Sequence, residues 1–153
     1  MSSEQVGESI EALLNQLDGS GTDCLWTAVQ PPRSTLGESL PDYLLTRYQS
    51  ARKWQVRSSC VYHCVRYART SESAARLALL ALNDKSKVVR SRACMVLACS
   101  QRKDLLSALQ QRLENYYEDT VDDLRAAVDA ITEQNQNYFV DRSHSGLTTL
   151  NIR

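Results

Sequence analysis

The sequence predicts an all-α fold, arranged as a short stack of helix pairs, and three observations support this prediction. From residue 41 onwards, apolar residues recur at the spacing of amphipathic helices. Residues typical of strands form no run before residue 138. The stretch that begins at Trp54 recurs in similar form at Lys87, which indicates a repeat. A chain of 153 residues is long enough for one domain and short for two, so we predict a single domain over residues 1–153.

The first forty residues are predicted to form one helix and one long loop. Apolar residues from Val6 to Leu17 share one helical face, which predicts an N-terminal helix within residues 1–18. Residues 19–40 contain glycines and prolines and are predicted to form a loop. A loop of this length is uncommon in a compact domain and is typical of a docked or functional segment. We expect Leu25 and Trp26 to hold it against the body of the protein.

Residues 41–136 are predicted to be almost entirely helical. Pro41 suits the first turn of a helix that ends near Ser50. The helices expected after it span residues 53–69, 71–83, 87–101, 103–117 and 120–134. At the start of the last of these, Thr120 and Asp123 have the spacing of a capping box.

Residues 137–153 are predicted to form a small C-terminal β-hairpin. Two runs of strand-forming residues, 138–140 and 147–152, are joined by a Ser-His-Ser-Gly stretch that suits a turn. A stack of helix pairs needs a different structure at its end to cover the last apolar face. We therefore expect the hairpin to act as this cap. Its apolar residues are Tyr138, Phe139, Val140, Leu147, Leu150 and Ile152.

The repeat has a period of about 33 residues. A shift of this size superposes Val56-Arg57-Ser58 on Val89-Arg90-Ser91, and a second predicted helix follows each copy. A helix pair in every unit of 20–50 residues is typical of an α-solenoid.

The unit around Arg90 resembles a HEAT repeat. Its matching residues, in the order D-x4-VR-x2-A-x3-L, are Asp84, Val89, Arg90, Ala93 and Leu97. The preceding unit has Ala51 in place of the aspartate, and a third unit keeps Asp119 and Arg125 at the same spacing. The resemblance covers residues 41–136 and implies a short right-handed α-solenoid of HEAT-like helix pairs. It also implies an ion pair between Asp84 and Arg90 near the start of a helix.

Two groups of residues resemble catalytic or metal sites, and we predict neither. Cys60, His63 and Cys64, with Cys94 near them in the repeat frame, could be proposed as zinc ligands. The repeat instead puts both cysteines of this trio where the other copy has core residues, so buried, reduced thiols are expected.

A Ser-His-Asp triad is the second possibility, from Asp141, Ser143 and His144. Neighbouring residues in a turn point in different directions, whereas a triad needs its base within hydrogen-bond reach of the nucleophile. Turn formation, with Gly146 at a positive φ, is the simpler interpretation. Phosphate-binding and nucleotide-binding motifs are also absent from the sequence. We predict no enzyme activity, no metal and no cofactor.

Charge is strongly segregated along a chain whose net charge is zero. Residues 1–46 and 113–133 each carry seven acids and one base, while residues 47–112 carry fourteen bases and three acids. Bases interleaved with aromatic residues suit an acidic partner surface. The predicted partner-binding residues are Tyr62, Arg66, Arg69, Arg76, Arg102 and Lys103.

These observations predict a non-catalytic protein-binding module. One version is an immunity or inhibitor protein that neutralises a cognate toxin or effector by direct binding, since a one-domain chain with polarised charge and no catalytic residues fits that role. The YFVDRSHSG segment is also similar to tails of small bacterial helical proteins. The alternative is a nucleic-acid-binding HEAT-like protein that uses its basic central helices. No run of eighteen apolar residues is present, so no membrane span is expected. The acidic N-terminus lacks the features of a secretion signal, so a cytoplasmic location is expected.

Overall fold

The computed structural model describes residues 10–15, 17–19 and 32–152, and these residues form an all-α structure without strands. Residues 10–14 and 32–36 are helical. The longer helices are α3 (Leu40–Ser50), α4 (Trp54–His63), α5 (Glu72–Ala81), α6 (Lys87–Ser100), α7 (Leu106–Leu113) and α8 (Val121–Thr132). Short 3-10 helices are η1 (Gly37–Ser39), η2 (Val65–Tyr67), η3 (Lys103–Leu105) and η4 (Gln136–Phe139).

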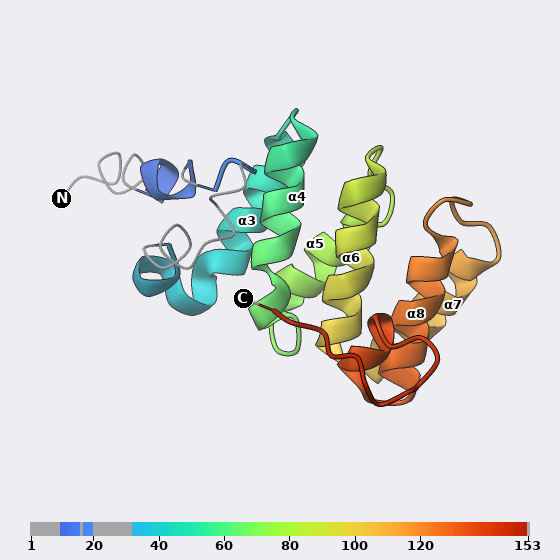
Figure 1. The fold of residues 1–153 in the computed structure, drawn as a ribbon. Coiled ribbons are helices and arrows are strands. Elements are labelled where there is room, and N and C mark those ends of the chain that lie inside the picture. Colours follow the sequence, from blue (N-terminus) through green and yellow to red (C-terminus); the bar gives the residue numbers. More distant parts are fainter. Residues whose placement is uncertain (1–9, 16, 20–31, 153) are drawn as a thin grey trace.

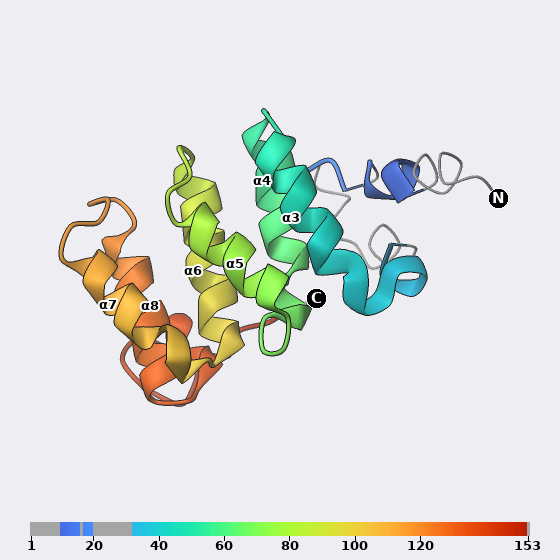
Figure 2. The same ribbon diagram turned by 180° about the vertical axis from the view of Figure 1, so that it is seen from behind.

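The helices form two layers, and successive helices of the chain alternate between them. Helices α4, α6 and α8 lie next to one another in one layer, while α3, α5 and α7 lie behind them (Figures 1 and 2). Each helix also packs against its neighbour in sequence, so that α3 pairs with α4, α5 with α6 and α7 with α8.

Small and aliphatic side chains fill the space between these helices. Alanines on facing helices, such as Ala78, Ala93 and Ala127, are fully buried and allow the backbones to approach closely. Leu97, Leu124 and other large aliphatic side chains complete the core. Serine caps help to start the second pair, since the Ser71 hydroxyl accepts a hydrogen bond from the Ala74 N–H at 3.1 Å.

The helices predicted over residues 41–136 are confirmed, with three local corrections. The helix expected over residues 103–117 begins as η3 and ends at Leu113. The helix expected over residues 53–69 ends at His63 and continues only as the short turn η2. The capping box is wrong, because Thr120 makes no capping bond to the first turn of α8. Its hydroxyl instead accepts a hydrogen bond from Arg90 Nε at 3.2 Å.

The described residues of the N-terminal region agree with one of its two predicted elements and correct part of the other. Residues 10–14 are helical, in agreement with a helix inside residues 1–18. The expected loop over residues 19–40 is wrong in its last part, where residues 32–36 and η1 form helical turns. Leu25 and Trp26 lie outside the described residues.

The predicted C-terminal hairpin is also wrong for residues 137–152. The chain forms η4 and then an irregular segment that runs back from α8 past α6 towards α4 (Figure 1). The Asp141 carboxylate holds this segment in a turn, because it accepts hydrogen bonds from the Ser145 N–H at 3.0 Å and the Gly146 N–H at 2.8 Å. These local bonds replace the ladder that a hairpin would need.

This segment still covers apolar surface at the end of the stack. Phe139 is buried, and Tyr138, Leu150 and Ile152 pack against the core. Two of the residues expected in the cap are instead exposed, namely Val140 and Leu147, and Leu147 is 89% exposed.

Candidate functional site

Arg57 joins two consecutive units of the stack. Its Nη1 donates to the backbone carbonyl oxygens of Arg52 at 2.6 Å and Ala51 at 3.5 Å, in the loop before α4. Its Nε and Nη2 donate to the carboxylate of Asp84 in the next unit, at 2.8 and 3.1 Å. One guanidinium therefore ties its own loop to the following helix pair.

Arg90 repeats this arrangement one unit later. Its Nη1 donates to the carbonyl oxygens of Asp84 at 2.8 Å and Lys85 at 3.1 Å, and its Nη2 donates to the Asp119 carboxylate at 2.9 and 3.1 Å. The expected ion pair between Asp84 and Arg90 is therefore wrong. Each arginine binds the carboxylate of the next unit and the backbone of its own, and we call these contacts the arginine ladder.

The Asp84 carboxylate accepts hydrogen bonds from three different residues. Besides Arg57, it accepts hydrogen bonds from the Tyr48 hydroxyl at 2.7 Å and the Ser86 N–H at 2.9 Å. Burial alone would raise the pKa of Asp84, but the bonds from Arg57, Ser86 and Tyr48 outweigh it and hold the pKa below its usual value. Asp84 is therefore a structural anion.

The residues predicted to bind a partner lie around the C-terminal ends of α4 and α6, and on α5. Four of them are exposed, namely Arg66, Arg69, Arg76 and Lys103. Tyr62 is only half exposed, with the Arg92 guanidinium 5.0 Å from the centre of its ring.

Arg102, the sixth predicted residue, lies in ion pairs. Its Nη2 binds Glu72 at 2.9 Å and Asp104 at 2.7 Å. The structure thus gathers several of these bases at one end of α4 and α6, but not as a single stripe on one helix. Positive charge at a helix C-terminus also stabilises the helix itself.

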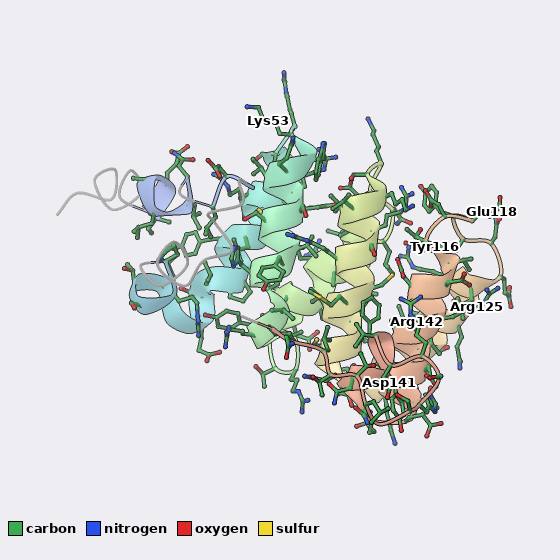
Figure 3. All side chains as sticks on the ribbon, in the orientation of Figure 1. Lys53, Tyr116, Glu118, Arg125, Asp141 and Arg142 are labelled. Atoms are coloured by element: carbon green, nitrogen blue, oxygen red, sulfur yellow. The ribbon has the colours of Figure 1, made fainter. Side chains whose placement is uncertain are left out.

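A second group of bases, which sequence reasoning did not single out as a site, lies at the opposite ends of α4 and α6. We call it the basic edge. It consists of the exposed bases Arg52, Lys53, Lys85 and Lys87, together with two exposed apolar residues beside them, Trp54 and Val88. Lys53 projects from this end of the molecule in Figure 3. One feature of the sequence could have revealed the basic edge. Bases stand immediately before or at the start of two helices, where the helix dipole disfavours positive charge.

Two neighbouring pockets open beside the basic edge. One, of about 430 Å³, is lined by residues that include Arg52, Asp84 and Lys85. The other, of about 190 Å³, is lined by residues that include Arg47, Arg52 and Lys53. Basic side chains therefore dominate the charge around both pockets.

The C-terminal residues that resemble a triad bond to other groups. His144 Nε2 lies 2.6 Å from an Asp129 oxygen, and its ring stacks on Tyr138 with 3.8 Å between the centroids. The Asp141 carboxylate binds Ser145 and Gly146, as described above. Both side chains therefore hold the terminal segment in place rather than orient Ser143.

The side chains of Cys60, Cys64, Cys94 and Cys99 are buried. Burial raises the pKa of Cys94 and of Cys99 to about 12, and it raises the pKa of Cys64 as well. Within the described ranges, no group of three His, Cys, Asp or Glu side chains is arranged to hold a metal ion.

Comparison with known proteins gave no relative of this chain. No protein-family model matches it, and neither a search of curated proteins nor a search of solved structures found a match. None of the described helices combines the length and the apolar character needed to cross a membrane.

Proposed function

We propose that this chain is a short right-handed α-solenoid of HEAT-like helix pairs that binds another protein without catalysing a reaction. The arginine ladder supports the repeat architecture, because Arg57 and Arg90 make equivalent contacts one unit apart. A ladder of this kind ties each helix pair to the next.

The observation that carries protein binding is the set of exposed bases that the fold does not neutralise. Several bases of the central segment form no ion pair with any other residue in the described ranges. These are Arg52, Lys53, Arg69, Arg76, Lys85, Lys87 and Lys103. Such bases, next to the exposed Trp54, suit an acidic protein surface.

Within the described residues, the acidic segment over residues 113–133 forms no ion pair with these bases, although the charge of Lys87 also acts on Asp119. Asp119, Asp122, Asp123 and Asp129 bind Arg90, Arg125, Arg142 and His144 instead. The described part of the acidic segment therefore leaves most of these bases open to an acidic partner. In the immunity version of this function, the partner is a cognate toxin that is neutralised when its acidic surface is covered.

A charge-reversal experiment tests protein binding. The wild-type chain is used to isolate its partner from the source organism, and binding of the purified partner is then measured with Arg66→Glu/Arg69→Glu. An Arg125→Glu variant is the control, because Arg125 is exposed but lies in the acidic segment. We expect the isolation to yield a protein partner. Weaker binding by the double variant alone would place the interface at Arg66 and Arg69, whereas normal binding by both variants would exclude that surface.

The nucleic-acid alternative predicts a different result in the same experiment. Nucleic acid rather than protein would then be retained by the wild-type chain, and raising the salt concentration would release it steeply. If the chain isolates neither a protein nor nucleic acid, the proposed function is wrong.

A further inference from the structure

The basic edge brings together residues from two helix pairs. Helices α4 and α6 lie side by side, and their N-terminal ends point to the same end of the molecule (Figures 1 and 2). Arg52 and Lys53 precede α4, and Lys85 and Lys87 flank the start of α6. Gly19 packs against the backbone of Gln55, so Asp18 lies close by, but the four bases leave the edge positive.

Bases in these positions do not stabilise the helices. Neither α4 nor α6 has an acid in its first turn, whereas α5 begins with Glu72 and α8 has Asp122 and Asp123 there. A positive side chain at a helix N-terminus is unfavourable, since that end of the helix dipole is itself positive. The helix dipole accounts for bases near the C-terminal ends of α4 and α6, but not for those of the basic edge.

The basic edge also carries apolar anchors and an enclosed donor. Trp54 is 43% exposed and Val88 is 44% exposed, each next to a lysine in the sequence. Arg47 lines the smaller pocket, and its enclosed Nε has no hydrogen-bond acceptor among the described residues. In the larger pocket, the Asp84 carboxylate is already held by Arg57, Tyr48 and Ser86.

We propose that the basic edge docks an acidic segment of a partner protein. Carboxylates of the segment bind Arg52, Lys53, Lys85 and Lys87, and its apolar side chains pack against Trp54 and Val88. Arg side chains enter such contacts as bidentate donors to carboxylates. This inference rests on the proposed function, since it names the surface and the chemistry through which protein binding occurs.

The surroundings of the basic edge favour a protein segment over nucleic acid. At the same end of the molecule, the third helix pair is acidic, with Glu118, Asp119 and Asp122 exposed. Figure 3 shows Lys53 and Glu118 at the upper ends of different helix pairs. A phosphate backbone that followed the edge would meet these carboxylates within one helix pair and be repelled. A short acidic segment ends before it reaches them.

The test uses two probes on the full chain, a short glutamate-rich peptide that contains leucines and a single-stranded oligonucleotide. Binding is followed by chemical-shift changes of the backbone amides and by fluorescence anisotropy. We expect the peptide to shift the amides of residues 52–56 and 85–89. Lys53→Glu/Lys87→Glu should weaken peptide binding about tenfold, because two favourable charge pairs become repulsive. Arg66→Glu/Arg69→Glu is the matched control and should bind normally.

Each contrary result has a separate meaning. Shifts centred on residues 66–69 and 102–103, or spread evenly over all exposed bases, would overturn the basic edge as the docking surface but leave the proposed function standing. Tighter binding of the oligonucleotide than of the peptide would overturn the partner chemistry and count against the proposed function. Absence of peptide binding at this surface would also overturn the inference.

Discussion

Replacing Asp84 with alanine should strongly destabilise the protein. The substitution removes the acceptor of four hydrogen bonds, which come from Arg57, Tyr48 and Ser86. The Asp84 side chain is only 3% exposed and that of Arg57 16%, so the remaining guanidinium would be a poorly solvated, unpaired charge. Breaking a buried ion pair costs about 3–5 kcal/mol, and the expected loss here is ~3 kcal/mol because the pair borders a pocket.

Thermal and urea unfolding measure this effect. For a chain of this length, a loss of about 3 kcal/mol lowers Tm by about 6–12 °C. Asp104→Ala is the matched control, because it also removes a carboxylate bound to an arginine, but an exposed one. We expect the Tm of the control to change little.

A double-mutant cycle tests whether Arg57 and Asp84 act together. Once Asp84 is absent, Arg57→Ala should cost much less than it does alone, because the unpaired charge is removed. The reasoning is refuted if the two single effects simply add, or if Asp84→Ala lowers Tm no more than Asp104→Ala. Acid should reproduce the loss, because a carboxyl with a lowered pKa stabilises the fold above its unfolded pKa and loses this effect as the pH falls through its folded pKa.

Further predictions concern a helix cap, the terminal segment and the buried thiols. Ser71→Ala removes the cap of α5 and should reduce the free energy of unfolding by about 1 kcal/mol, as measured by urea unfolding; no change would contradict the capping role. The hydrogen bond to Asp129 raises the pKa of His144. The stabilisation that this bond gives to residues 141–150 is therefore fully present below the unfolded pKa, about 6.5, and is lost as the pH rises through the folded pKa. Protection factors of that segment against amide exchange should fall over this range, and an NMR titration should locate the pKa. Asp129→Asn should reduce the pKa shift and leave the smaller contributions of Glu133 and Asp141. In a Cys24→Ser background, the four buried thiols should react with a thiol reagent only as fast as the protein unfolds, and rapid labelling of the folded protein would show that they are accessible.

The sequence predicted the helices well where one face of apolar residues was enough to define them. The structure has α6 over Lys87–Ser100 and α8 over Val121–Thr132, close to the expected ranges 87–101 and 120–134. The 3.6-residue period of apolar residues is a local property of the sequence, so it can be recognised without knowing which other helices pack against it. The two similar stretches of sequence also share Arg57 and Arg90, and both arginines form the arginine ladder.

The errors arose where side chains had a choice of partners. Strand-forming residues after Tyr138 suggested a hairpin, but the Asp141 carboxylate and the contacts with α8 hold that segment in an irregular path. Asp123 suited a capping box, yet its carboxylate accepts hydrogen bonds from Ser91 and Arg142 instead. Such competition depends on residues far apart in the chain, so spacing alone does not resolve it.

The sequence by itself determined that this protein is helical and that its charge is segregated along the chain. These properties follow from periodicity and composition, which are already complete in the linear chain. Only the tertiary structure decided which charges are neutralised. Arg57 and Arg90 find their carboxylates 27 and 29 residues away, while Lys53, Lys85 and Lys87 remain exposed at one end of two adjacent helices. The partner of a charged side chain is set by which helices pack together, and that packing places the basic edge on the surface.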